Sequence, residues 1–242
     1  MEKIRLAILA SGSGTTTEAI IKSKKVDVAL VVTNNKDAAV VEKAQKLMVE
    51  VEIVPRAPYK VVKDGVEDME ASRLSYGQVL LDKFAQYQVN WVSQNGWMVL
   101  TPENVVEQFE GRIVNQHPGP LDPGYPDFGG VGMYRIRVHA AVLNFARRIK
   151  RPFQTEATIH QVNEKYDQGE LLMTHQVEIL DNDSPETLQK RVLPVEHQLQ
   201  IDFWQKVQNG GVTSFKRTQR LILPGEEKIL EEAKKLAIEQ YQ

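Results

Sequence analysis

The sequence predicts an α/β protein with a Rossmann-like, open, mostly parallel twisted sheet that carries helices on both faces. Two observations predict this class. The first apolar run, residues 4–10, is almost continuous, as in a strand buried on both faces, and it ends at a glycine turn that leads into a helix. Strand-like and helical patterns then alternate along the chain, which favours parallel strands joined by helices.

Each further element follows from its own residue pattern. Runs rich in β-branched and apolar residues predict strands at 4–10, 26–33, 51–54, 89–93, 111–115, 155–162 and 170–179. Apolar residues at helical spacing predict helices at 15–24, 37–48, within 65–87, 102–109, 132–148, 184–208 and 226–241. We expect a catalytic domain at 1–210 and a C-terminal appendage with a terminal helix at 211–242.

Composition excludes several functional classes. The 242 residues include 30 Lys and Arg against 32 Asp and Glu, so the chain has no general field that attracts nucleic acid or an acidic membrane. It contains no cysteine, which excludes a disulfide framework and a thiolate metal site, and we expect no metal. No apolar run approaches the roughly 18 residues of a membrane helix, and the N-terminus lacks a signal-peptide pattern, so a cytoplasmic protein is expected.

A glycine turn between the first strand and the first helix consists of Gly12, Ser13, Gly14, Thr15 and Thr16. Backbone N–H groups and the helix dipole favour an anion at such a turn, and glycine lets a phosphate approach the backbone. The third glycine of the dinucleotide fingerprint is replaced by Thr17, and there is no P-loop lysine. We expect a phosphomonoester site, and the alternative is a tight turn without a ligand.

Polar side chains end the fifth predicted strand, at Asn115 and His117. Because residues i and i+2 of a strand project to the same side, this amide and this imidazole share a face, and Pro118 then ends the pairing. Such a pair suits a reaction that develops an oxyanion and moves a proton. Asp167, in a turn between the last two strands, is a candidate to orient the histidine. Purely structural roles for all three residues remain the alternative.

A long loop is predicted after the fifth strand, within the glycine- and proline-rich segment 111–132. This segment holds six of the fifteen glycines and four of the eleven prolines. Loops of more than about 12 residues in a compact domain are usually functional or disordered, and this one follows the polar strand end directly. We therefore expect the part at 119–132 to border the substrate pockets.

The terminal helix carries an apolar stripe of Ile229, Leu230, Ala233, Leu236 and Ala237. The stripe predicts that the helix packs against the body of the protein or a second subunit. None of the candidate catalytic residues lies in it. We therefore expect truncation after residue 222 to lower stability or change the oligomeric state, but to leave detectable activity.

Together these residues resemble the folate-dependent formyltransferase family over about residues 1–205. The resemblance implies that Asn115, His117 and Asp167 are catalytic, because they match an Asn-x-His-Pro segment and an aspartate seven residues after a strand histidine. It implies that Gly12–Thr16 bind the substrate phosphate and Glu196 its ribose. The folate-binding positions that it implies are Arg73, Met98, Val99, Leu100, Asn163, Glu164, Lys165 and Tyr166.

The sequence also departs from the family pattern. The segment 127–133 looks like an insertion, Thr16 replaces a loop asparagine, and the family's arginine after Met98 is missing. A shifted proline suggests that Asp122–Pro123 holds the family's cis peptide. None of these departures changes Asn115, His117 or Asp167, on which the implied reaction type depends.

The resemblance implies transfer of the formyl group of 10-formyltetrahydrofolate to the primary amine of glycinamide ribonucleotide in purine biosynthesis, by a chain that could form a homodimer. His117 would be held cationic, with a raised pKa, by Asp167. Alternatives are a formyltransferase that uses another phosphorylated amine, a nucleotide-binding oxidoreductase, and an inactive member that only binds nucleotide or folate.

Overall fold

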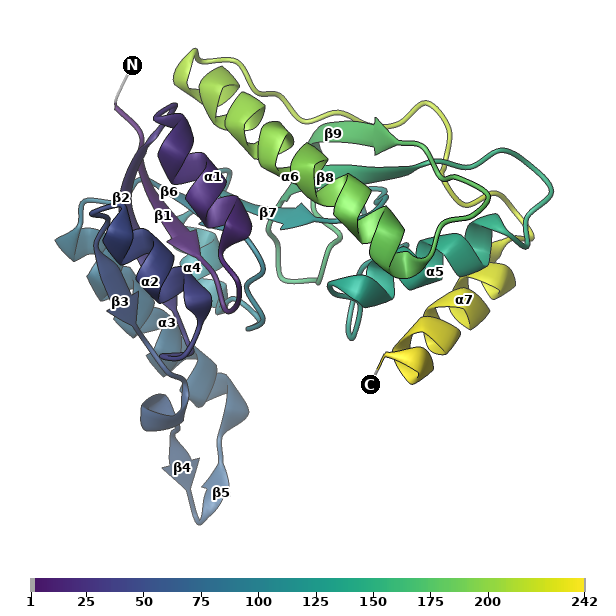
Figure 1. The fold of residues 1–242 in the computed structure, drawn as a ribbon. Helices are drawn as coiled ribbons and strands as arrows, with labels where there is room; N and C mark the ends of the chain where they lie inside the picture. The colour runs from purple at the N-terminus through teal and green to yellow at the C-terminus, as the bar shows by residue number, and fades with distance from the viewer. Residues whose placement is uncertain (1–2, 242) are drawn as a thin grey trace. The chain divides into compact units, whose positions relative to one another are not determined.

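The computed structural model describes residues 3–241, which form two compact units (Figure 1). Unit one comprises the described residues up to 114 together with 204–211. Unit two comprises residues 115–203 and the described residues from 212 onward. The chain passes between the units at three points: within strand β7 (Ile113–His117), within helix α6 (Pro185–Gln208), and between Gly211 and Val212.

Unit one is built on parallel strands in the order β3-β2-β1-β6. Their bounds are Arg5–Leu9 for β1, Asp27–Thr33 for β2, Val51–Ile53 for β3 and Trp91–Gln94 for β6. The apolar side chains of β1 are fully buried, in agreement with its continuous apolar run. The predicted α/β class with a mostly parallel sheet is therefore confirmed.

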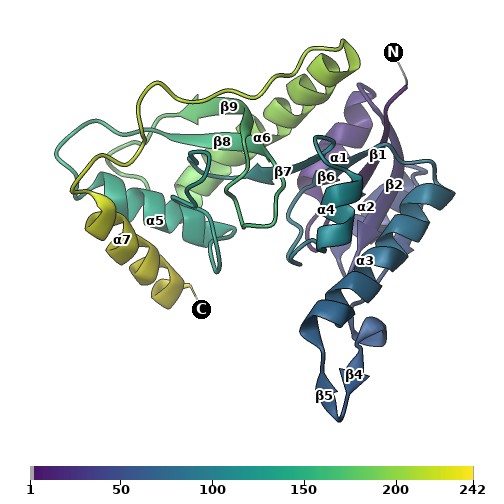
Figure 2. The same ribbon diagram turned by 180° about the vertical axis from the view of Figure 1, so that it is seen from behind.

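Helices cover both faces of this sheet. Figure 1 shows α1 (Thr15–Ser23) and α2 (Ala39–Lys46) on one face, and Figure 2 shows α3 (Met69–Gln86) and α4 (Glu103–Gln108) on the other. A short helix, η1 (Ala57–Tyr59), and a hairpin come before α3.

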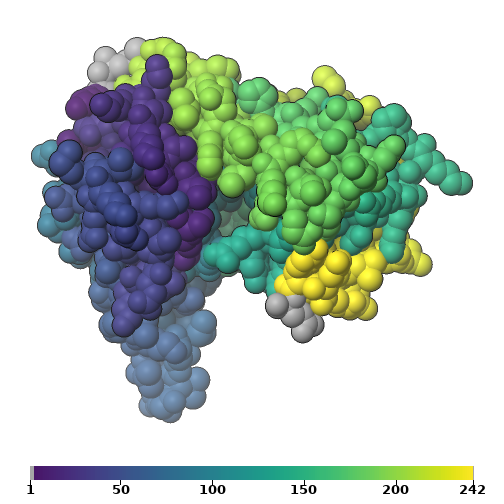
Figure 3. Space-filling view, viewed as in Figure 1, coloured from purple at the N-terminus to yellow at the C-terminus, as the bar shows by residue number. Residues whose placement is uncertain are grey.

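The hairpin consists of β4 (Val62–Lys63) and β5 (Val66–Glu67), and it extends from unit one as the slate-blue projection in Figure 3. Val62 and Val66 are 61% and 71% exposed. The sequence analysis did not predict this hairpin, because its strands are two residues long and have no buried face.

Unit two contains the antiparallel pair β8 (Thr155–Gln161) and β9 (Leu171–Val177). Helix α7 (Glu227–Gln240) packs on α5 (Ile136–Ala146), as Figures 1 and 3 show, and it buries Ala233 and Ala237 completely. The predicted docking of the terminal helix is confirmed. Leu236 is nevertheless 40% exposed, so the contact stripe is narrower than the sequence predicted.

The ends of most predicted helices and strands lie within two or three residues of the observed ends. Two local predictions need correction. Strand β7 continues through His117, so Asn115 and His117 lie inside it. The Asp122–Pro123 bond is trans, because the segment turns through a bridge between Asp122 and Tyr125 instead of through a cis proline.

Candidate active site

Asn115 and His117 project from one face of β7 toward Asp167 in the turn between β8 and β9, as their i, i+2 spacing predicts. The amide nitrogen of Asn115 donates to Oδ1 of Asp167 at 3.2 Å. Nδ1 of His117 lies 3.8 Å from Oδ2 of the same carboxylate. The structure thus brings the three predicted catalytic side chains together, and we call them the catalytic cluster.

The Asp167 carboxylate is fixed by the loop as well as by β7. The backbone N–H of Gly130 donates to its Oδ2 at 2.8 Å. A Cβ atom on Gly129 would lie 2.6 Å from Cβ of Asp167, so the glycine allows the loop to pass this close. Asp167 has a φ of 54°, in the left-handed region that favours glycine and, less strongly, Asp and Asn.

The imidazole of His117 is almost fully buried, with 3% exposure. Its Nε2 lies 3.2 Å from the carbonyl oxygen of Phe128, which fits an N–H donor at this nitrogen. Burial lowers the pKa of His117, and the Asp167 charge opposes this shift without overcoming it. The expectation of a raised pKa is therefore wrong, because the ring is desolvated and 3.8 Å is too long for a hydrogen bond to the carboxylate.

Asp167 remains ionised beside this neutral imidazole. Burial would raise its pKa, but interactions with the neighbouring imidazoles of His117 and His160 and the hydrogen bond from the Gly130 N–H together lower the pKa well below its usual range. The site therefore pairs a proton acceptor, the neutral ring, with an anion that can stabilise the ring after it takes up a proton.

His160 joins the cluster although the sequence analysis gave it no role. Its Nε2 lies 3.1 Å from the amide nitrogen of Asn115 and 3.4 Å from Oδ1 of Asp167. Its Nδ1 faces the carbonyl oxygen of Gln161 at 2.7 Å, which fits an Nδ1–H donor and leaves Nε2 as an acceptor. Residue alternation could not have indicated that this side chain points inward, because His160 shares its face of β8 with the polar residues Glu156 and Thr158, which the structure also buries.

Glu196 lies on α6 and binds Gln116 of β7, whose amide nitrogen donates to its Oε1 at 2.8 Å. Burial raises the pKa of Glu196 to about 7, and the bond from Gln116 works in the opposite direction. The side chain is 7% exposed. The sequence analysis missed Gln116 because it points to the opposite face of β7 from Asn115 and His117.

The glycine turn belongs to unit one and is fixed by backbone contacts. Gly14 has a φ of 65°, and the carbonyl of Gly12 accepts from the N–H of Val40 at 3.2 Å. A Cβ on Gly14 would lie 2.6 Å from Cβ of Val40, so only glycine fits. Nearby, the hydroxyl of Ser11 accepts from the N–H of Met98 at 3.0 Å.

The residues of the turn differ in exposure: Ser13 is exposed, Thr15 is half-buried, and Gly14 and Thr16 are buried. The turn leads directly into the first residue of α1, where N–H groups without helical partners favour an anion. This geometry is compatible with the predicted phosphate role.

The predicted folate-binding residues fall in both units. Arg73 on α3 and Met98 are exposed, Val99 is buried and Leu100 is half-buried, all in unit one. In unit two the residues that lead into Asp167 are all exposed, and they are Asn163, Glu164, Lys165 and Tyr166. Their folate contacts stay predictions.

Within residues 3–241, no three His, Asp or Glu side chains are arranged to hold a metal ion. No helix in the described part of the chain is long and apolar enough to cross a membrane.

Comparison with known proteins gives matches over the same stretch of chain. A family model described as formyl transferase matches residues 4–203. The chloroplastic phosphoribosylglycinamide formyltransferase of Arabidopsis thaliana is 37% identical over 203 residues, which cover 82% of this chain and 63% of that protein. The corresponding Bacillus subtilis enzyme is 25% identical, over 80% of this chain and 89% of its own. The chain spans less than two thirds of the two plant relatives, 63% and 59%.

Solved structures agree with these matches. The phosphoribosylglycinamide formyltransferase of Bacillus halodurans has a TM-score of 0.67 and 31% identity, with 84% of this chain and 94% of that chain covered. Glycinamide ribonucleotide transformylase 1 of Symbiobacterium toebii has a TM-score of 0.71 and 26% identity, with 86% and 89% covered. The family model covers most of the chain, including β7 and the turn that holds Asp167, and the protein therefore belongs to the formyl transferase family.

Proposed function

We propose that this protein transfers the formyl group of 10-formyltetrahydrofolate to the primary amine of glycinamide ribonucleotide, the reaction named for its relatives. The observation that carries the proposal is the catalytic cluster, in which Asn115, His117 and Asp167 converge within hydrogen-bonding or near hydrogen-bonding distance. An amide donor, a neutral imidazole and a carboxylate are the groups that direct acyl transfer to an amine needs.

In this mechanism the substrate amine attacks the formyl carbon directly and forms a tetrahedral intermediate. Neutral His117 accepts the proton that the amine loses, and the Asp167 carboxylate stabilises the resulting imidazolium. His117 then returns that proton to the folate nitrogen as the bond from this nitrogen to the formyl carbon breaks. One amine proton thus moves to the leaving group, and no covalent enzyme intermediate is needed.

Asn115 is proposed to stabilise the oxyanion of the intermediate. Its amide nitrogen carries two N–H groups. One is directed at Asp167, and the other lies within reach of Nε2 of His160, an acceptor that a substrate oxygen can replace. A donor that is already held in place by Asp167 has little reorganisation to undergo during the reaction.

Substrate binding is proposed to use the residues that the resemblance assigns. The backbone of Gly12–Thr16 would hold the phosphate, and binding energy from this remote group would position the amine. Glu196, whose pKa is raised to about 7, can accept from or donate to a ribose hydroxyl depending on its protonation. Folate would contact Arg73, Met98, Val99 and Leu100, with Asn163–Tyr166 beside Asp167.

The proposal is tested by mixing the purified chain with 10-formyltetrahydrofolate and a panel of phosphorylated amines, and following folate absorbance. Glycinamide ribonucleotide should give the highest kcat/KM. The matched variants are His117→Gln, which should remove turnover, and His175→Gln on the exposed part of β9, which should not. A higher kcat/KM with another amine would reassign the substrate, and absence of formyl transfer to any amine would reject the activity.

We also propose that residues 1–210 form the catalytic domain and 211–242 an accessory segment, that the protein acts in the cytoplasm, and that it can form a homodimer. Its plant relatives are named as chloroplastic, so the location needs its own test by cell fractionation. Light scattering at several protein concentrations tests the dimer.

A further inference from the structure

Lys234 of α7 binds the backbone of the loop that follows β7. Its ammonium group donates to the carbonyl oxygens of Asp127 and Gly129, both at 2.7 Å. The lysine is half-buried and Asp127 is 97% buried, so these charge-assisted bonds are formed partly away from water. They fix the Asp127–Phe128 and the Gly129–Gly130 peptide groups.

The peptide group between these two, and the N–H of the second, face the catalytic cluster. The carbonyl oxygen of Phe128 lies 3.2 Å from Nε2 of His117. The N–H of Gly130 donates to Asp167 at 2.8 Å. We call residues 127–130 the bridging segment. Its carbonyl groups at Asp127 and Gly129 bind Lys234, whereas its Phe128 carbonyl faces His117 and its Gly130 N–H binds Asp167.

We propose that Lys234 is a positioning residue for the catalytic cluster, which it holds in place through the bridging segment. This inference rests on the proposed function of the cluster. It changes the expectation for the terminal helix, because α7 contributes no catalytic group and yet fixes the segment that touches two of them. Loss of α7 should therefore reduce formyl transfer strongly, although some activity should remain.

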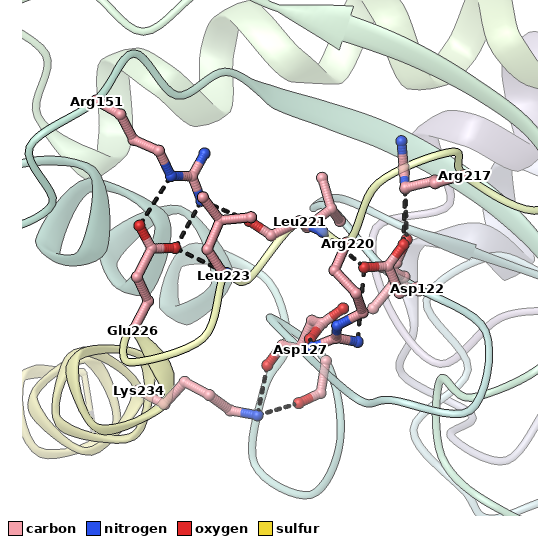
Figure 4. Close-up of polar contacts among 11 residues, drawn as sticks. Asp122, Asp127, Arg151, Arg217, Arg220, Leu221, Leu223, Glu226 and Lys234 are labelled. Carbon is pink, nitrogen blue, oxygen red and sulfur yellow. Dashed lines mark hydrogen bonds and ion pairs between the residues drawn. The ribbon is translucent and has the colours of Figure 1, made fainter.

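Residues just before α7 reinforce the same segment from a second direction, as Figure 4 shows. Arg220 donates to Asp127 at 3.1 Å. It also stacks on the ring of Tyr125, with 3.6 Å to the ring centroid. Arg217 pairs with Asp122 at 3.1 Å. It also pairs with the buried Glu156 of β8. The loop is thus held at both 122 and 127 by cations from the end of the chain.

Lys234 also contributes to the electrostatic surroundings of His117. The titratable groups that face this imidazole are Asp167, which raises its pKa, His160 and Lys234, which lower it, and His139, whose own buried ring interacts with it. Removing the Lys234 charge should therefore raise the pKa of His117. A residue that only packed α7 against the loop would not shift this pKa through its charge.

The test compares Lys234→Met with Lys235→Met, the adjacent lysine, which is exposed and pairs only weakly with Glu239 at 3.9 Å. For Lys234→Met we expect kcat to fall about tenfold or more with little change in KM for the ribonucleotide, because small displacements of reacting groups are costly. The acid limb of the kcat–pH profile should move to higher pH. Lys234→Arg keeps the charge and should keep the parental acid limb.

A second measurement does not depend on activity. NMR titration of the His117 ring in histidine-labelled protein should give a higher pKa in Lys234→Met than in the parent and in Lys235→Met. An inactive parent would reject the proposed function, while the titration would still decide the positioning role. A Lys234→Met protein with parental kcat and an unmoved His117 pKa would overturn the inference, provided its thermal unfolding shows that it is folded.

Discussion

Two glycine-containing loops of this protein follow strands, β1 and β7, and they are fixed in different ways. The first, Gly12–Thr16, uses its own backbone: Gly14 adopts a φ of 65° and packs against Val40, a residue only 26 positions away. The second, residues 119–132, is held by side chains from far along the sequence, among them Arg217, Arg220 and Lys234.

The difference teaches where the precision of each loop comes from. The first loop depends on dihedral angles that only glycine adopts without strain, and a phosphate site needs little more than exposed N–H groups at a helix start. The second loop must bring one carbonyl and one N–H group to His117 and Asp167. Its glycines permit the close approach, but ionic contacts fix its position.

The largest effect should come from Asp167→Asn. This substitution removes the negative charge that both the second loop and β7 contact. We expect kcat to fall on the order of 10³-fold, since the neutral amide cannot stabilise protonated His117 and its NH₂ group competes for the Asn115 bond. Asp181→Asn, in an exposed turn of the same unit, is the control. Steady-state kinetics and calorimetry should show a loss of turnover with ribonucleotide binding nearly unchanged. Near-normal turnover would remove Asp167 from the mechanism.

Gly14→Val should cause the next largest effect, on the first loop alone. A side chain at φ 65° is strained, and its Cβ would overlap Val40, so we expect the free energy of unfolding to fall by about 3 kcal/mol. Gly65→Ala separates the two causes, because it also has a positive φ of 79° but nothing within 4 Å of its Cβ. The free energy of unfolding of Gly65→Ala should fall by only about 1 kcal/mol. Urea denaturation measures both, and equal losses would mean that the Val40 contact does not matter.

Gly14→Val should also abolish binding of the phosphorylated substrate in the fraction that remains folded, while folate binding persists. Weaker folate binding with the ribonucleotide spared would reverse the assignment of the two pockets.

The contrast between the loops also explains what the sequence could predict. The first loop, the strand–helix alternation and the shared face of Asn115 and His117 depend on local geometry, which residue type and spacing determine. The position of the bridging segment does not depend on local geometry. It depends on Lys234, which lies 104 residues beyond Gly130, and no periodicity in the sequence predicts such a contact. The burial that reverses the expected pKa shift of His117 is likewise a property of the packed fold.

Lowering the pH should change the chemistry at the second loop and its histidine more than phosphate binding at the first loop. The first loop contains no titratable side chain between Gly12 and Thr16. The pKa of His117 lies below its usual value of about 6.5 because the ring is buried, so the neutral ring predominates above that pH. At saturating substrate, kcat should be level above about pH 6.5 and should fall as the pH drops through the lowered pKa. A midpoint of the acid limb above pH 6.5 would show that the Asp167 charge, and not burial, determines the direction of the His117 pKa shift.

The smallest effect should come from Glu18→Gln, in the first turn of α1 behind the glycine turn. Lys22 and Lys43 hydrogen-bond to this carboxylate and lower its pKa to about 2, so it is ionised at neutral pH and sits where an incoming phosphate would also place negative charge. Its removal leaves both lysines unneutralised, and we expect ribonucleotide affinity to rise by about twofold at low salt, with the gain lost at high salt.

Glu42→Gln, which breaks an exposed pair with Lys46 on α2, should leave affinity unchanged. Calorimetry at two salt concentrations makes the comparison, and an equal gain in both variants would reflect net charge alone. A gain confined to Glu18→Gln would instead place the anion at the start of α1, close enough to Lys22 and Lys43 for their released charge to be felt.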